Sequence, residues 1–201
     1  MSLLPIYLFG TEVLKKKAKP VKEIDNGVVK LVLDMFETMH KANGIGLAAT
    51  QVGALQRVLV IDISDVGAED EEDGEPTPED IRRRTSPELP KTLTLINPVL
   101  SHEEGSWGME EGCLSIPEVR SSVERAETVR VKFRDINFKE QEFTADGLLA
   151  RVILHEVDHL NGILFLDRIT AAQRKLFKTK LKQIRSGVVE TSYPTVSEEE
   201  E

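Results

Sequence analysis

Three stretches of the chain carry apolar residues at the spacing of an amphipathic helix. The first is 26–43, which Asp25 or Asn26 can cap and Gly44 can end; its apolar residues are Val28, Leu31, Val32, Met35, Phe36 and Met39. The second is 146–161, which ends at Asn161-Gly162, and the third is 171–184, which is basic on one side. The pattern therefore predicts three helices.

Four other stretches have the composition of strands. Residues 57–63 and 93–100 are rich in Val, Leu and Ile, whereas 128–135 alternates apolar and polar residues. A short turn separates this last stretch from 139–144, so the two are expected to form a hairpin. Because strands and helices do not alternate regularly, their order favours an α+β fold over a parallel α/β sheet.

Two acidic stretches interrupt this pattern. Residues 64–90 are poorly hydrophobic, charged and Pro-containing, which predicts a surface insertion without core contacts. Residues 187–201, which end in four glutamates, are expected to form a loose, flexible tail. These stretches account for the net charge of −9, and the rest of the chain is mildly basic. We therefore expect one domain over 1–186, with the insertion on its surface.

The composition favours a soluble protein in a reducing compartment. Hydrophobic residues make up 40% of the chain, but no run approaches the roughly 20 apolar residues of a membrane helix. The short apolar start is broken by Pro5 and precedes its lysines, which is the reverse of a secretory signal. The single cysteine, Cys113, excludes an internal disulfide framework. We therefore expect a cytoplasmic protein with no membrane partner.

The clearest chemical signal is His155-Glu-Val-Asp-His159 in the second predicted helix. Residues four apart lie on one helix face, so both imidazoles can bind one metal ion. Glu156 stands beside the first histidine, where it can accept a proton and pass it on. The apolar residues around the motif predict a buried helix, in which titratable groups need partners.

Two histidines leave a metal site incomplete, because a catalytic site usually has three protein ligands and one open position. A third histidine six residues after the second is absent, since Phe165 occupies that position. Cys113 lies in Glu110-Glu-Gly-Cys-Leu-Ser-Ile-Pro117, between predicted strands, and a thiolate is a good soft ligand. Taken alone, a single cysteine is more often a plain core residue. Beside a two-histidine helix that lacks a ligand, we expect it to complete the site.

The segment Gly44-Ile-Gly-Leu-Ala-Ala-Thr-Gln51 has two interpretations. It matches the G-x-G-x-x-A fingerprint of dinucleotide-binding proteins, but it follows a predicted helix where that fingerprint needs a strand. We favour the alternative, a loop packed close to a substrate backbone. Hydrolysis of a carbonyl compound needs donors aimed at the developing oxyanion, and the Gln51 amide and the Leu114 backbone N–H are candidates.

These three segments, in this order and spacing, resemble the peptide deformylases. The resemblance covers roughly residues 5–170 and excludes the acidic insertion and the tail. It implies mixed or antiparallel sheets packed around a central helix that carries the HExxH metal site, with a C-terminal helix. It also implies a metal-dependent hydrolase that removes the N-formyl group from the formyl-methionine of newly synthesised proteins and releases formate.

The resemblance assigns roles to individual residues. Glu156 would act as general base and acid, and Gln51 and the Leu114 amide would stabilise the tetrahedral intermediate. The metal ligands would be Cys113, His155 and His159. The residues lining the methionine pocket and the peptide groove would be Ile45, Gly46, Leu114, Leu148 and Val152, with Arg120 at the groove mouth.

Ligand chemistry and the family resemblance lead to different expectations for the metal, and the resemblance alone suggests the partners. Ligand types alone favour zinc, whereas the family implies Fe²⁺, with Ni²⁺, Co²⁺ or Zn²⁺ as substitutes. A ferrous–thiolate centre would be sensitive to oxygen. The implied partners of this monomer are N-formyl-methionyl nascent peptides and the ribosome, approached through the basic helix 171–184. The alternative for that helix is an ordinary solvated face.

One residue departs from the pattern of the family. Arg151 stands one turn before His155, where an aliphatic residue is common, so its side chain could narrow the pocket or favour an acidic residue in the peptide.

Three other functions would each account for part of the sequence. A metallopeptidase built on the same helix would not explain the motif around Cys113. A thiol hydrolase would use Cys113 as nucleophile without a metal. A non-catalytic metal-binding module would not need Glu156.

Overall fold

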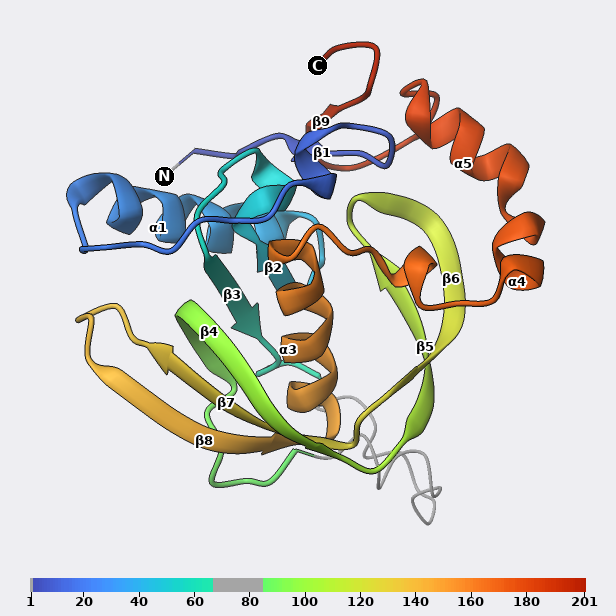
Figure 1. The fold of residues 1–201 in the computed structure, drawn as a ribbon. Helices are drawn as coiled ribbons and strands as arrows, with labels where there is room; N and C mark the ends of the chain where they lie inside the picture. Colours follow the sequence, from blue (N-terminus) through green and yellow to red (C-terminus); the bar gives the residue numbers. More distant parts are fainter. Residues whose placement is uncertain (1, 67–84) are drawn as a thin grey trace.

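The computed structural model describes residues 2–66 and 85–201 and has an α+β fold (Figure 1). Most of the expected surface insertion 64–90 lies outside the described residues. The strands are β1 (Ile6–Tyr7), β2 (Gly46–Ala48), β3 (Val58–Asp62), β4 (Thr92–Glu104), β5 (Trp107–Cys113), β6 (Ile116–Arg125), β7 (Thr128–Arg134), β8 (Glu140–Asp146) and β9 (Thr195–Val196). The α-helices are α1 (Asn26–Lys41), α3 (Gly147–Leu160), α4 (Ala171–Leu176) and α5 (Lys178–Arg185), with 3₁₀ turns at η1 (Val13–Lys15), η2 (Ala49–Val52) and η3 (Phe165–Asp167).

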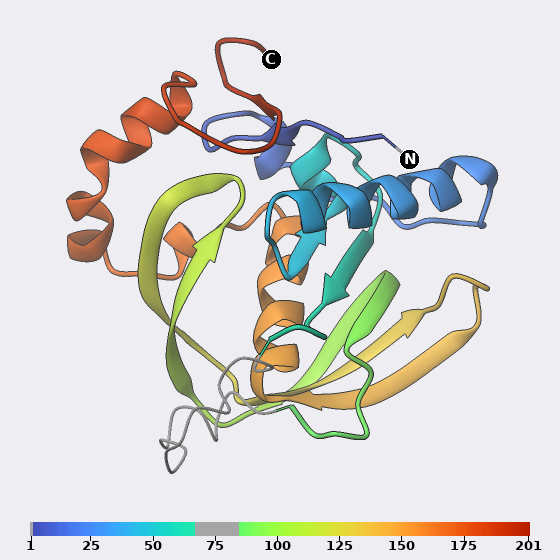
Figure 2. The same ribbon diagram turned by 180° about the vertical axis from the view of Figure 1, so that it is seen from behind.

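Most strands belong to one antiparallel sheet with the order β2-β3-β4-β7-β8. A separate antiparallel pair is formed by β5 and β6, and a short parallel pair is formed by β1 and β9. Helix α3 runs between the five-stranded sheet and the β5–β6 pair, as the two opposite views agree (Figures 1 and 2). This arrangement confirms the expected α+β class with antiparallel sheets.

Helix α3 is buried along its whole length. All fourteen of its residues, Gly147–Leu160, have little or no solvent exposure, and its apolar side chains pack with β2, β3 and β7 in the largest core cluster. Asn161 and Gly162 end the helix as the sequence predicts. Gly162 has φ +75°, and a Cβ there would lie 2.3 Å from the carbonyl oxygen of Lys15, so the tight turn requires glycine. No helix in the described ranges is long and apolar enough to cross a bilayer.

The other expected elements agree with the structure apart from their ends. Asp25 caps α1 by accepting a hydrogen bond of 2.8 Å from the backbone N–H of Val28. Helix α1 ends at Lys41 with Ala42 as its C-cap, two residues before the expected end, and Asn43 then adopts φ 53°, a conformation that asparagine tolerates. The predicted hairpin forms between β7 and β8, and its inward side chains Val129 and Val131 are fully buried.

The pairing of β5 with β6 was not predicted. Residues Trp107–Cys113 include two glycines and two glutamates, which have weak strand propensity, so the stretch carries no local strand signal. It becomes a strand because it pairs with β6, in which inward and outward residues alternate. The consequence for the site is that Cys113 ends a strand and directly faces Ile116 across the turn.

Two expectations about the C-terminal region differ from the structure. The single helix expected over 171–184 is broken at Phe177 into α4 and α5. The break lets Leu181 and Ile184 enter the core, whereas Leu176, at the end of α4, is 80% exposed. Within the segment 187–201, expected to be a loose tail, Thr195–Val196 form β9, which is hydrogen-bonded to β1 through main-chain groups.

Candidate active site

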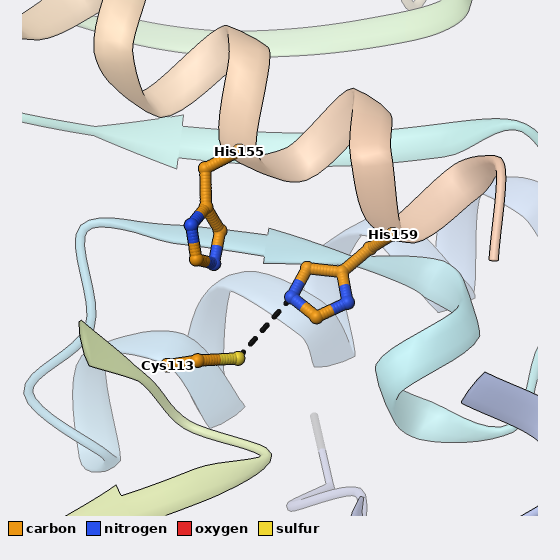
Figure 3. Close-up of side chains that lie close together, drawn as sticks. All are labelled: Cys113, His155 and His159. Atoms are coloured by element: carbon orange, nitrogen blue, oxygen red, sulfur yellow. Dashed lines mark hydrogen bonds between the residues drawn. The ribbon is translucent and has the colours of Figure 1, made fainter. Parts of the chain in front are cut away.

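The three expected metal ligands come together from two distant parts of the chain. His155 and His159 project from one face of α3, and Cys113 reaches them from the end of β5 (Figure 3). One donor atom from each side chain lies within 4.8 Å of the other two, and Sγ of Cys113 is 3.2 Å from Nε2 of His159. A thiolate and two imidazoles are a donor set that binds divalent transition metals.

Glu111 fixes the orientation of the first histidine. Its Oε2 atom lies 2.9 Å from Nδ1 of His155, and the pair is buried. When Nδ1 carries the proton for this hydrogen bond, Nε2 is left as the unprotonated ring nitrogen facing the cluster. For His159, burial lowers the pKa well below its usual value, which favours the neutral imidazole that a metal requires. For His155, burial is outweighed by the hydrogen bonds with Cys113 and Glu111, which raise its pKa well above the usual value, so a metal ion would have to displace the proton from Nε2.

A chain of buried charges extends from Glu111 to the far side of α3. Both oxygens of Glu111 accept hydrogen bonds from Arg125, at 2.6 and 3.0 Å. Arg125 also donates to Asp158 on α3 at 2.7 Å, and Asp158 accepts from Arg168. Although burial opposes it, the bonds with His155 and Arg125 hold the pKa of Glu111 well below its usual range. Glu111 is therefore an ionised carboxylate beside the candidate metal centre.

Glu156 also lies beside the three expected ligands, but its environment shifts its pKa in the opposite direction from that of Glu111. The side chain is only 4% exposed, and burial raises its pKa to about 7. Its Oε2 atom has no hydrogen-bond partner among the described residues. Its Oε1 atom lies against Gly46, where a Cβ would come within 2.6 Å. A buried carboxyl with a pKa near neutrality can both accept and donate a proton at physiological pH.

Gln51 lies on η2, opposite α3. Its Oε1 accepts a hydrogen bond of 2.8 Å from the backbone N–H of Ala48, which fixes the orientation of the amide. Its Nε2 therefore faces the cluster, 3.6 Å from Sγ of Cys113 and 3.3 Å from Oγ of Ser115. The side chain is 1% exposed. The amide donor is thus held next to the sulfur atom, as a donor for a nearby oxyanion would need to be.

A cavity of about 600 Å³ opens onto the cluster. Every residue that the sequence predicted for the site contributes to its lining except His159, which is 1% exposed. The apolar part of the lining contains Ile45, Leu114, Leu148 and Val152, and Arg120 is its exposed cation. Two segments that the sequence did not assign also line it, Met109–Gly112 and Glu190–Tyr193.

The expectation that Arg151 presents a free charge at the rim is not supported by the structure. The side chain is 3% exposed, and its guanidinium donates to Glu111 at 2.9 Å and to the carbonyl oxygens of Val123 and Trp107. It also lies over the Trp107 ring, 5.0 Å from the centroid. Although its Nε has no hydrogen-bond partner among the described residues, both terminal nitrogens of the guanidinium donate to groups of the chain, so Arg151 supports Glu111 and does not offer a free cation to an acidic peptide residue.

Glu111 and Arg125 were missed by the sequence reasoning. Glu111 is two residues before Cys113, and in a regular strand this spacing puts both side chains on one side, which is a usable signal, although the register of β5 with β6 shifts between these two residues. Arg125 ends a strand whose alternating positions are buried, and a cation on the buried face requires an anionic partner. Neither signal identifies the partner, because the pairs join β5, β6 and α3.

The chain is similar to known proteins over most of its length. The family model described as polypeptide deformylase matches residues 3–175. A peptide deformylase from Salinibacter ruber is 42% identical over 200 residues, covering 99% of this chain and 97% of the relative. One from Thermodesulfovibrio yellowstonii is 44% identical over 182 residues, covering 90% and 98%. The crystal structure of a peptide deformylase from Legionella pneumophila superposes with a TM-score of 0.76 at 36% identity, covering 93% and 98%.

The fold and the site thus define an enzyme with a partly buried Cys-His-His cluster. The chain belongs to the peptide deformylase family, which confirms the resemblance found in its three motifs.

Proposed function

We propose that this protein removes the N-formyl group from the formyl-methionine of newly synthesised polypeptides by hydrolysis, releasing formate and a free α-amino group. One observation carries the proposal. The cavity that holds Glu156, Gln51 and Cys113 is lined by the apolar residues expected for a methionine pocket, in a chain of this family. Its volume of about 600 Å³ is in the range of small-ligand sites.

The residues proposed to hold the metal are Cys113 through Sγ and both histidines of α3 through Nε2. The metal would be one divalent ion, Fe²⁺ by family resemblance, with Ni²⁺, Co²⁺ or Zn²⁺ as substitutes. When bound, such an ion supplies Lewis acidity, which polarises a carbonyl and makes water a stronger nucleophile at neutral pH. Glu111 supports this role, because its hydrogen bond to Nδ1 holds His155 in one tautomer.

Glu156 would move the proton during the reaction. As the carboxylate, it accepts a proton from the water that attacks the formyl carbon. It then donates this proton to the amine nitrogen as the C–N bond breaks, so that formate and the amine are the products. A pKa of about 7 suits both steps, because the group is neither fully ionised nor fully protonated at neutral pH.

Gln51 and the Leu114 backbone N–H would stabilise the negative charge that develops on the formyl oxygen. The position of Gln51 Nε2 beside Cys113 supports this role. The peptide itself has a natural partner in β2, which is an edge strand of its sheet and contributes Gly46 to the cavity. An extended peptide can hydrogen-bond to such an edge and place its first side chain among Ile45, Leu148 and Val152.

The ribosome remains a proposed partner of this monomer in the cytoplasm. Helices α4 and α5 carry six cations, but three of them are already paired with acidic residues: Arg174 with Asp167, Lys180 with Glu118, and Arg185 with Glu198. Lys175, Lys178 and Lys182 are exposed and offer charge to a phosphate backbone. Co-sedimentation with ribosomes that weakens steeply with salt, and weakens further when these lysines become glutamines, would support the contact.

Formate release from a formyl-Met tripeptide tests the proposed function. The protein is purified without oxygen and its metal content is quantified before the assay. Activity that a chelator abolishes and Fe²⁺ or Ni²⁺ restores is the expected result. No formate from fully metal-loaded protein would overturn the proposal, and cleavage of an unformylated peptide would instead support the metallopeptidase.

Substitution of Glu156 by glutamine tests the proton transfer. The amide keeps the size of the side chain but cannot exchange the proton, so we expect full metal content with activity reduced about 10²–10⁴-fold. The matched control is Glu142→Gln, an exposed carboxyl on β8, which is expected to keep normal activity. Unchanged turnover in Glu156→Gln would favour a thiol hydrolase or a site that is not catalytic.

A further inference from the structure

The segment Glu190–Tyr193, here called the tail segment, forms part of the active-site cavity. These four residues line the same cavity as Cys113 and Glu156, although they lie beyond α5. Gly187, with φ +73°, ends α5 and allows the chain to turn back towards the molecule. The two views show the chain after α5 returning to the side of the molecule where β1 lies (Figures 1 and 2).

Main-chain hydrogen bonds hold the chain immediately after the tail segment. The backbone N–H of Ile6 donates to the carbonyl of Pro194 at 2.9 Å, and that of Leu8 donates to Val196 at 2.8 Å. These bonds form the parallel β1–β9 pair. The position of Tyr193 is therefore set by secondary structure, which an unattached tail would lack.

Tyr193 reaches from this segment to the main chain of the active site. Its hydroxyl donates a hydrogen bond of 2.9 Å to the carbonyl oxygen of Leu114, and its ring packs against the core cluster of α1, β2 and β3. Burial, together with the nearby Cys113, raises the pKa of Tyr193 to about 12. The hydroxyl thus stays protonated and remains a donor throughout the neutral pH range.

The turn Leu114–Ser115 is held at three points. Besides the bond from Tyr193, the backbone N–H of Phe9 donates to the Ser115 carbonyl at 2.8 Å, and Gln51 Nε2 lies 3.3 Å from the Ser115 hydroxyl. Because a peptide unit is planar, a bond to the Leu114 carbonyl fixes the whole plane between these two residues. The hydrogen bond from Tyr193 thereby restricts the backbone torsion ψ of Leu114, the residue directly after Cys113.

We propose that Tyr193 is a positioning residue for the reaction. Through the Leu114 carbonyl it holds the Leu114 main chain, including the backbone N–H that is proposed to stabilise the oxyanion, in its place beside Cys113. The inference rests on the proposed function, since it assigns Tyr193 to that same reaction. The tyrosine does not need to touch the substrate, so its loss acts on turnover more than on substrate binding.

The test compares two tyrosine-to-phenylalanine substitutions in the full-length, metal-loaded protein. Tyr193→Phe keeps the ring that packs in the core and removes only the hydroxyl. Tyr7→Phe is the matched control, because Tyr7 belongs to the β1–β9 pair but is not among the residues that line the cavity. For each variant kcat and KM are measured with a formyl-Met tripeptide, together with metal content and Tm.

We expect Tyr193→Phe to lower kcat about ten-fold and change KM less than two-fold, with metal content and Tm near those of wild type. This is a fraction of the roughly 10²–10³-fold loss caused by removing an oxyanion donor outright. Tyr7→Phe should match wild type. A transition-state mimic should lose affinity for Tyr193→Phe by the same factor as kcat/KM, whereas a peptide product should not.

The outcomes separate this inference from the proposed function. A wild-type protein without deformylase activity would overturn the proposed function before any variant is compared. An active wild type and an equally active Tyr193→Phe would overturn the positioning role alone. The positioning role would also be overturned if the loss of kcat in Tyr193→Phe were fully explained by a lower metal content or accompanied by a clearly lower Tm. A purely structural role of the tyrosine predicts that result.

Discussion

Nδ1 of His155 lies 2.9 Å from Oε2 of Glu111, and both groups are buried. The same carboxylate accepts hydrogen bonds from Arg125 and Arg151. Although burial opposes it, the interactions with His155 and Arg125 hold the pKa of Glu111 below its usual range, and the ionised carboxylate orients the imidazole. The candidate metal site is thus supported by a charge network that reaches across β5, β6 and α3.

Glu111→Gln should weaken both metal binding and folding. The amide cannot balance Arg125 and Arg151, and removing one partner of a buried ionic network costs about 3–5 kcal/mol. Loss of the hydrogen bond to His155 should lower metal affinity about 10–100-fold. Equilibrium unfolding of the metal-free protein and competition with a chelator measure the two effects separately. Glu110→Gln, which changes the exposed neighbour, is the control, and equal behaviour of both variants would refute the role of Glu111.

The far end of the network predicts a contrast between two residues that contact each other. Asp158 is 4% exposed and bonds to Arg125 and Arg168, whereas the Arg168 side chain is 43% exposed. Asp158→Asn leaves Arg125 short of a buried counter-charge and should cost about 3–5 kcal/mol. Arg168→Met removes a solvent-exposed partner and should cost about 0–1 kcal/mol. Urea unfolding gives both values, and similar losses would contradict the buried network.

Gly46→Ala should reduce activity through direct crowding of Glu156. A Cβ at this position would lie 2.6 Å from Glu156 Oε1 and 2.7 Å from Cγ1 of Val152, and both are confined in the core. A displacement of about 1 Å of the proton-transferring group is expected to cost about 10²-fold in kcat. Gly112→Ala is the control, since its Cβ would meet only Arg120 at 3.5 Å. Normal kinetics for Gly46→Ala would show that Glu156 tolerates the shift.

Stability at acid pH should depend on Asp34 of α1. Lys30 and the backbone N–H of Ser2 hydrogen-bond to this carboxylate and lower its pKa to about 2. An unfolded aspartate titrates near pH 3.9, so the stabilisation is fully present above about pH 4 and is lost as the pH falls towards 2. Wild type should therefore exceed Asp34→Asn in stability at pH 6, and the difference should shrink below pH 4. A difference independent of pH would disprove the assignment.

Patterns of neighbouring residues in the sequence were enough to predict several helices and part of the candidate site. The apolar spacing in 26–43 and 146–161 was enough for two helices, because amphipathic periodicity is a property of consecutive residues. The spacing of His155 and His159 was enough to place both imidazoles on one face. The absence of a third histidine pointed to Cys113, and the structure brings the three donor groups together.

Tertiary contacts decided the rest, because the relevant partners are far apart in the chain. The strand ending at Cys113 exists only through pairing with β6, and the break at Phe177 follows from the burial of Leu181 and Ile184. The composition of the last residues predicted a loose tail, yet main-chain bonds to β1 override composition.

The electrostatic environment of each site residue was also set by the fold. Glu111, Glu156 and Arg151 carry ordinary charged side chains, and nothing in the sequence distinguishes their states. Hydrogen bonds with His155 and Arg125 keep Glu111 ionised although burial opposes it, whereas burial raises the pKa of Glu156 to about 7. Sequence by itself determined which chemical groups are present and which of them share a helix face. Only the packing of α3 between its two sheets determined the protonation state and the orientation of each group, because desolvation and charge pairing depend on neighbours in space.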